Sequence, residues 1–156
     1  MSERAIERWF ADYATSHQNP TNKKIHFICV PTIFFTVVGL LWSIPVPALF
    51  APIPYLNWAT LAMLLVLAYY LRLSVPLALG MLLFTLLCIG MLSWMSAQQL
   101  PVLWISLGIF VVAWIGQFVG HEIEGKKPSF FKDLQYLMIG PAWVLGYLFR
   151  RAGIRY

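Results

Sequence analysis

The distribution of charge restricts the fold of this chain more than any other feature of its sequence. From Ile25 through His121, Arg72 is the only Lys, Arg, Asp or Glu, and the other charged residues lie in two terminal stretches. A helix that packs on the core of a soluble protein still turns one polar face to water. The stretch from Ile25 to His121 has almost no charged residues to form such a face. Charged residues make up 11% of the chain, against about 25% in a typical soluble domain. The sequence therefore predicts an integral membrane protein.

Four apolar runs approach the roughly 20 residues that a helix needs to cross a bilayer. They cover residues 25–44, 57–74, 75–94 and 100–120. Each is expected to be a helix, because an open sheet edge cannot satisfy its backbone polar groups in lipid. The predicted fold class is all-α, a four-helix transmembrane bundle that forms a single membrane domain over residues 1–156.

The terminal stretches are expected to lie at the membrane surface. In residues 1–24, the apolar side chains of Ile6, Trp9, Phe10 and Tyr13 recur at helical spacing, which predicts an amphipathic cytoplasmic helix. The tail, residues 121–156, has an apolar part from 134 to 149 that is interrupted by Gly140 and Pro141. This part is short for a span, so we expect a re-entrant or interfacial helix.

Lysines and arginines set the expected orientation. They precede the first run, mark the turn after the second and follow the fourth: Lys23, Lys24, Arg72, Lys126, Lys127 and Lys132. By the positive-inside rule, both termini and the Arg72 turn face the cytoplasm. We expect a multi-pass protein of the inner membrane if the source is bacterial, or of the endoplasmic reticulum if it is fungal. The net charge of +5 is not gathered in a basic run, so no nucleic-acid partner is expected.

Two of the three histidines, His17 and His26, lie close to the start of the first run. The residue before a proline is pushed out of the helical region, so the Asn19–Pro20 step is expected to end the N-terminal helix. Thr21 or Asn22 can then cap the first transmembrane helix. On one unbroken helix the two rings would point to opposite faces, whereas the break lets them converge.

His121 follows the fourth run in the stretch QFVGHEIEG. Gln117 lies one turn earlier on the same helix face, Glu124 lies nearly one turn later, and Gly120 leaves space beside the imidazole. The predicted topology puts His121 at the same cytoplasmic end as His17 and His26. Three imidazoles and a carboxylate at one depth form a ligand set for a divalent first-row metal.

Simpler interpretations of these residues stay open. A histidine at a membrane interface commonly serves only as a polar anchor, although here all three fall on one side. Glu122 and Glu124 can be solvated partners of the nearby lysines instead of ligands. Arg72 can be an anchor whose charged end reaches the interface, or it can bind the carboxylate of a substrate.

Two stretches together carry a resemblance to a known family. YATSHQNPTNKKIHFICVP (13–31) and WIGQFVGHEIEGKKPSFF (114–131) are similar to the paired motifs of the fungal and bacterial 2-hydroxy fatty acid dioxygenases, long described as a membrane domain of unknown function. The matching positions are Tyr13, His17, Asn22, His26 and Pro31, then Gln117, Gly120, His121, Glu124 and Pro128.

The resemblance implies an enzyme that uses Fe(II) and molecular oxygen to shorten 2-hydroxy fatty acids by one carbon. In fungi this α-oxidation belongs to the breakdown of phytosphingosine, a sphingolipid component. The implied iron ligands are His17, His26 and His121. We expect catalytic roles around the metal for Gln117, Glu124, Asn22 and Tyr13, and we expect the acyl chain to lie among the helices or in membrane lipid.

Two other functions are compatible with the sequence. One is a non-catalytic membrane scaffold or chaperone, and the other is a small transporter. A transporter usually has ionisable groups near the midplane, and this sequence places none there, so transport ranks last. The sequence does not determine the chain length of the substrate, whether the chain forms an oligomer, or whether Glu124 or water completes a metal site.

Overall fold

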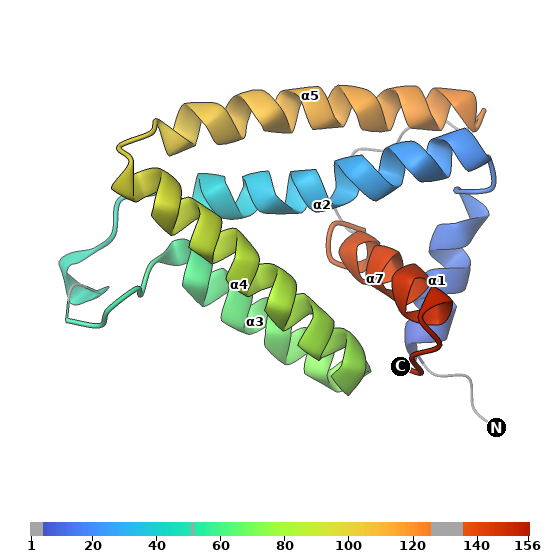
Figure 1. The fold of residues 1–156 in the computed structure, drawn as a ribbon, viewed down its shortest axis with the longest axis horizontal. Coiled ribbons are helices and arrows are strands. Elements are labelled where there is room, and N and C mark those ends of the chain that lie inside the picture. Colours follow the sequence, from blue (N-terminus) through green and yellow to red (C-terminus); the bar gives the residue numbers. More distant parts are fainter. Residues whose placement is uncertain (1–4, 51, 126–135) are drawn as a thin grey trace.

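The computed structural model describes residues 5–50, 52–125 and 136–156, and the regular structure within them is helical (Figure 1). The α-helices are α1 (Ala5–Thr15), α2 (Pro20–Trp42), α3 (Trp58–Leu73), α4 (Val75–Ala97), α5 (Val102–Ile123) and α7 (Ile139–Arg151). A short 3-10 helix, η1 (Ala48–Phe50), follows α2. The predicted all-α fold is confirmed for these residues.

Within the described residues, three helices are long and apolar enough to cross a membrane. They are α2, α4 and α5, with 23, 23 and 22 residues and mean hydropathies of 2.1, 2.4 and 2.1. α3 is apolar but has only 16 residues. At 1.5 Å per residue it is about 24 Å long, against a hydrocarbon core of about 30 Å. The structure therefore does not confirm the predicted span at residues 57–74.

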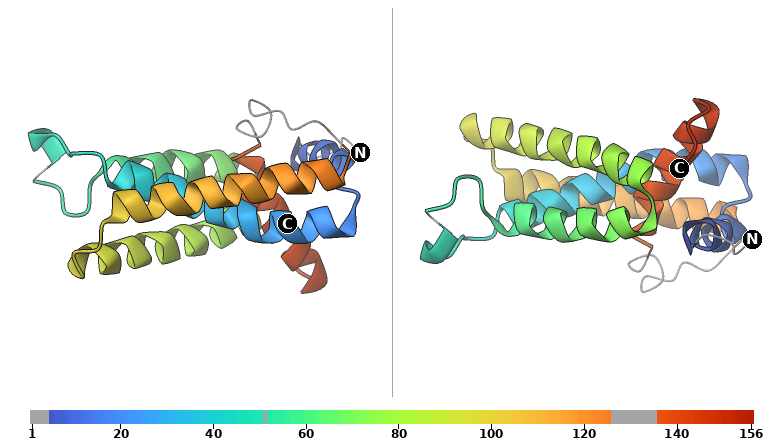
Figure 2. Two further views of the ribbon diagram at one scale, coloured as in Figure 1. Left: turned by 90° about the horizontal axis from the view of Figure 1, so that it is seen from above. Right: turned by 90° about the horizontal axis from the view of Figure 1, so that it is seen from below.

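The long helices form two pairs. α2 packs along α5, and α3 packs along α4, whereas contacts between the pairs are fewer (Figures 1 and 2). The pairs approach each other near η1 and diverge toward the opposite end (Figure 1). The predicted four-helix bundle is not confirmed: the four helices form two diverging pairs, and α7 packs between them (Figure 1).

α7 contacts α1, α2 and α4 at the diverging end of the helix pairs. Close approach depends on glycine at two positions. A Cβ atom on Gly140 would lie 2.8 Å from Val30 of α2, and one on Gly80 of α4 would lie 2.9 Å from Phe149. The C-terminal helix is therefore a packed element of the fold. The start of its predicted apolar part, residues 134 and 135, lies outside the described residues, as do the lysines at 126, 127 and 132.

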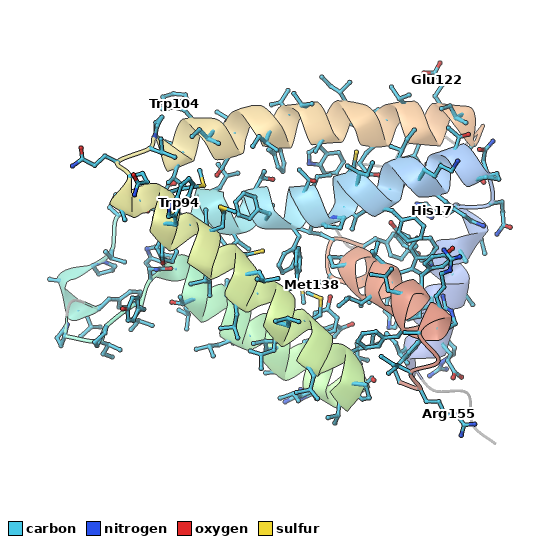
Figure 3. The ribbon with its side chains drawn as sticks, in the orientation of Figure 1. His17, Trp94, Trp104, Glu122, Met138 and Arg155 are labelled. Carbon is cyan, nitrogen blue, oxygen red and sulfur yellow. The ribbon has the colours of Figure 1, made fainter. Side chains whose placement is uncertain are left out.

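α1 has the amphipathic character that its sequence predicts. Ile6, Phe10 and Tyr13 are buried, and Trp9 packs partly buried against the same core. α1 lies at the same end of the molecule as the start of α2, the end of α5 and the C-terminus (Figure 1). Trp94 and Trp104, both exposed, lie at the far end (Figure 3).

Candidate metal centre

Three elements bring the three histidines together. His17 follows α1, His26 lies in the second turn of α2, and His121 lies in the last turn of α5. One ligand nitrogen from each ring can be chosen so that all three lie within 4.8 Å of one another. The side chains are 3%, 1% and 5% exposed. The structure therefore brings the three imidazoles into a buried cluster at one end of the molecule, and the sequence predicts that they lie at a common end.

The Nδ1 atoms of two imidazoles are fixed by backbone carbonyls. Nδ1 of His17 lies 2.7 Å from the carbonyl oxygen of Tyr13, and Nδ1 of His26 lies 3.0 Å from that of Asn22. A carbonyl oxygen only accepts hydrogen bonds, so both Nδ1 atoms carry a proton, and in the neutral form of each ring the lone pair lies on Nε2. Metal-binding histidines show this arrangement, in which the second ring nitrogen is held by a hydrogen bond.

The turn between α1 and α2 sets the position of His17, and it differs in detail from the prediction. α1 ends at Thr15, and α2 already begins at Pro20. Asn19 is the N-cap, and its side chain accepts hydrogen bonds from the backbone N–H groups of Thr21 and Asn22. The predicted cap at Thr21 or Asn22 is wrong, because proline has no N–H to satisfy and fits best at the first position of a helix.

Glu124 ties the end of α5 to this turn. Its carboxylate accepts hydrogen bonds from the backbone N–H groups of Gln18 (2.7 Å) and Asn19 (2.9 Å) and from Nδ2 of Asn22 (2.9 Å). Burial alone would raise the pKa of this carboxyl group, but the three hydrogen bonds and the nearby His17 outweigh it and lower the pKa below its ordinary value. Both carboxylate oxygens are thus engaged in holding the segment next to His17.

Asn22 is completely buried between α2 and α5. Besides its bond to Glu124, its Nδ2 donates to the carbonyl of Ser16 at 3.3 Å. A Cβ atom on Gly120 would lie 2.4 Å from Oδ1 of Asn22 and 3.2 Å from Cε1 of His26. Glycine at this position therefore lets α5 approach the residues that hold the imidazoles.

A small cavity of about 30 Å³ lies beside the cluster, which is enough space for one or two water molecules. Its lining residues come from α1, α2, α5 and the segment before α7: Tyr13, His26, Val30, Ile33, Trp114, Gln117, Tyr136 and Leu137. Gln117, predicted as a catalytic residue, is 6% exposed and forms part of this wall. The imidazole of His26 thus faces a space in which a small polar group fits.

Residues 4–152 match the sequence model of a family described as 2-hydroxy-palmitic acid dioxygenase Mpo1-like. The chain belongs to the Mpo1-like family. The 2-hydroxy-palmitic acid dioxygenase MPO1 of Saccharomyces cerevisiae is 31% identical over 137 residues, which cover 85% of this chain and 73% of the yeast protein. No solved structure matches the chain. The family match confirms the resemblance noted in the two sequence motifs.

Aromatic side chains from α1 and from the C-terminal part pack beside the cluster of this Mpo1-like chain. The ring of Tyr13 stacks on His17, with 4.1 Å between centroids and 10° between planes. Trp143 of α7 lies 5.7 Å from the ring of His17, and Tyr136 makes an edge contact with Tyr13. The sequence gives no local signal for Trp143 or Tyr136, because their spacing is that of an ordinary apolar tail.

Two of the charged candidates lie away from the cluster. Arg72 is exposed in the last turn of α3 and does not line the cavity. Glu122 is exposed at the end of α5, where its side chain points outward (Figure 3). The binding of a substrate carboxylate by Arg72 remains a prediction.

The donor set of this Mpo1-like chain fits a divalent metal ion. Three imidazoles converge in a buried site, and two of them have Nδ1 held by a backbone carbonyl, as metal-binding histidines do. Imidazole nitrogens bind zinc, copper, iron and nickel, so the donor atoms alone do not distinguish these metals. The assignment of the metal depends on the proposed reaction.

Proposed function

We propose that this Mpo1-like protein is an Fe(II)-dependent dioxygenase that shortens 2-hydroxy fatty acids by one carbon. The observation that carries the proposal is the convergence of His17, His26 and His121 beside a partly apolar cavity. The name of the yeast relative, 2-hydroxy-palmitic acid dioxygenase, supports the substrate class and the reaction. The three imidazoles would hold iron from one side and leave the cavity side for substrate and oxygen.

The iron would supply electron transfer to molecular oxygen, which protein side chains alone do not provide. In the proposed overall reaction, the bond between carbons 1 and 2 of the 2-hydroxy acid breaks and carbon 2 is oxidised to a carboxylic acid. One molecule of oxygen is consumed, and the other products are carbon dioxide and water. Atoms and electrons balance without a further reductant.

The surrounding residues have separate proposed roles. Gln117 lies in the cavity wall, where its amide can donate a hydrogen bond to the carboxylate or hydroxyl group of the substrate. Asn22 and Tyr13 hold the Nδ1 protons of His26 and His17 through their carbonyls. Glu124 positions the turn that carries His17, so we propose that water or substrate, and not Glu124, completes the metal coordination.

The proposed location is the cytoplasmic face of a membrane, with α2, α4 and α5 as spans and both termini on that face. The positive-inside pattern supports this orientation. α1 and the C-terminal end of α7 lie together at one end of the molecule, where His17 also lies, as a site at the membrane surface requires (Figures 1 and 3). A fatty acid could then place its polar end at the metal while its chain stays in an apolar environment.

The test combines metal analysis with turnover. Protein purified without chelators should contain stoichiometric iron and convert 2-hydroxypalmitate to pentadecanoate only when oxygen is present. His17→Ala, His26→Ala and His121→Ala should each lose iron and turnover while still inserting into the membrane. Removing one ligand from a metal site leaves too few donors to hold the ion against chelation.

Glu122→Gln is the matched control, because Glu122 lies next to His121 but is exposed and outside the cavity. This variant should keep both iron and activity. Wild-type activity that survives complete iron removal would refute the iron assignment. Protein that contains no metal and is inactive on all 2-hydroxy acids would favour a non-catalytic scaffold.

A further inference from the structure

The last turn of α7 is exposed on one side of the molecule. Residues from Ile139 to Val144 are buried, whereas Leu148 is 51% exposed. Figure 2 shows this end of the helix projecting to one side of α2 and α5. Arg155 lies toward the same end of the long axis as His17 (Figure 3). The end of α7 therefore points outward near the end of the molecule that carries the candidate metal centre.

This end of the chain is basic and apolar at once. Residues 136–156 contain three arginines and no Asp or Glu. All three arginines are exposed, and two large apolar side chains lie exposed among them. We call this set the basic end of α7, and it consists of Leu148, Arg150, Arg151, Ile154 and Arg155. Segments that lie on acidic lipid surfaces combine these two kinds of side chain, because apolar groups enter the headgroup boundary while basic groups meet phosphates.

Two of the guanidinium groups are held in place by aromatic rings. Arg150 lies 5.8 Å from the ring centroid of Tyr156 and donates a hydrogen bond to its hydroxyl group. Arg151 lies 5.8 Å from the ring centroid of Tyr147. The ring of Tyr156 in turn makes an edge contact with Phe10 of α1. A guanidinium group that is already ordered loses less freedom when it binds a phosphate.

The turn after α7 places Arg155 near Arg150. Gly153 has φ +73°, and the N–H of Ile154 donates to the carbonyl of Phe149 at 2.8 Å, so the chain reverses directly after the helix. A surface groove of about 530 Å³ lies at this reversal, and its lining residues are Glu7, Arg150, Gly153, Ile154, Arg155 and Tyr156. Glu7 is the one acidic side chain among them, against two arginines. The groove has room for a headgroup phosphate.

The helix end alone does not explain this arrangement. The carbonyl groups at the C-terminus of a helix favour nearby cations, which accounts for Arg150 and Arg151 in the last turn. Arg155 lies beyond the helix, and Leu148 and Ile154 have no charge to place. A soluble anion would use the arginines but would leave these two apolar side chains in water. A lipid surface engages both kinds of side chain.

We propose that the basic end of α7 binds the headgroups of acidic phospholipids in the membrane leaflet at this end of the molecule. The inference rests on the proposed membrane location and does not depend on the proposed reaction. The guanidinium groups bind the phosphates, and Leu148 and Ile154 enter the boundary between headgroups and acyl chains. The same helix places Trp143 5.7 Å from the ring of His17, so a bound lipid also holds the helix that packs beside the histidine cluster.

The test measures lipid binding by the full chain in neutral detergent, with native mass spectrometry as the readout. Phosphatidylglycerol should bind at least about 10-fold more tightly than phosphatidylcholine. One basic residue near an acidic lipid surface contributes about 5-fold, so the triple variant Arg150→Gln, Arg151→Gln, Arg155→Gln should lose most of this preference. The preference should also fall as salt is added, because exposed charges are screened.

Two further variants separate a local site from net charge and from folding. Lys23→Gln, Lys24→Gln, Arg72→Gln removes the same number of charges elsewhere and should keep the preference for phosphatidylglycerol. Arg150→Lys, Arg151→Lys, Arg155→Lys keeps the charges and should retain most of the preference. Equal binding of both lipids by the wild type would overturn the inference, as would equal losses in the two triple glutamine variants.

Glycerol phosphate distinguishes a lipid from a soluble phosphate compound. It carries the headgroup chemistry without acyl chains, so it should not displace bound phosphatidylglycerol at millimolar concentration. Displacement would assign the groove to a soluble anion and overturn the lipid assignment. Lipid binding is measured here without metal or turnover, so a failure of the proposed reaction leaves this result unchanged.

Discussion

One added methyl group at Gly120 should weaken both metal binding and the stability of the fold. In Gly120→Ala the new Cβ would lie 2.4 Å from Oδ1 of Asn22, about 1 Å closer than the 3.4 Å at which ordinary van der Waals contact begins. Asn22 cannot simply turn aside, because its Nδ2 donates to Glu124. Either α5 moves away from α2, or the charged hydrogen bond is lost.

Both responses lower the free energy of unfolding. Overpacking a close contact costs about 1–3 kcal/mol, and losing a hydrogen bond to a charged group costs about 1.5–3 kcal/mol. Alanine recovers up to about 1 kcal/mol of helix propensity, which leaves Gly120→Ala about 0–2 kcal/mol less stable than wild type. A shift of His26 relative to His121 should also weaken metal binding about 10-fold, the low end of the range for changes next to metal ligands.

Two glycines serve as controls for Gly120→Ala. Gly108 is on the same helix, and a Cβ there would meet nothing within 4 Å, so Gly108→Ala should be neutral or stabilising and should keep full metal affinity. A Cβ atom on Gly39, far along α2 from the histidines, would lie 2.2 Å from Oγ of Ser106, so Gly39→Ala should reduce stability without changing metal affinity.

The measurements are unfolding in detergent micelles and anaerobic titration of Fe(II). Metal affinity and stability of Gly120→Ala equal to those of Gly108→Ala would refute the reasoning from close packing.

Three further predictions concern contacts around the site. The pKa of Glu124 in the folded protein is below its ordinary value of 4.5, so the contribution of Glu124 to stability is present above about pH 4.5 and is lost as the pH falls below that value. Unfolding at several pH values should show a smaller acid-induced loss of stability in Glu124→Gln than in the wild type. The loss in Glu122→Gln should equal that of the wild type. Tyr70→Phe leaves the carbonyl of Met138 without its donor, which should lower the free energy of unfolding by about 1–3 kcal/mol, as measured by unfolding in detergent micelles. Chelation of the metal should lower the melting temperature of the wild type, since a ligand at 100 times its Kd contributes about 2.7 kcal/mol to the free energy of unfolding. The same treatment should leave the melting temperature of His26→Ala unchanged. An equal shift in both proteins would argue against a metal at this site.

The local sequence predicted the parts of the site that depend on neighbours in the chain. The break near Pro20 correctly indicated that His17 and His26 could converge, although the cap is Asn19 and the new helix begins at the proline itself. The distribution of charge put His121 at the same end, where the structure places it. Each of these inferences uses helix periodicity or the chemistry of a single residue.

Contacts between distant residues were predicted less well. The carboxylate of Glu124 was a candidate metal ligand in the sequence, whereas in the structure it bonds to Gln18, Asn19 and Asn22, more than 100 positions away. Trp143 and Tyr136 gave no signal of their place beside the histidines. Their partners are set by how α7 packs, which the pattern of apolar residues in the tail does not specify.

The sequence by itself determined that this chain forms apolar helices with its charges and histidines at their ends, because transfer of charged groups into lipid is too costly to allow another arrangement. The tertiary structure decided that the helices diverge as two pairs, that α7 enters between them, and that a cavity lined by Ile33 and Trp114 lies beside the imidazoles. These features depend on the close packing of side chains from helices far apart in the chain. Volume and shape at such contacts follow from all the packed residues together, and no single stretch of the sequence encodes them.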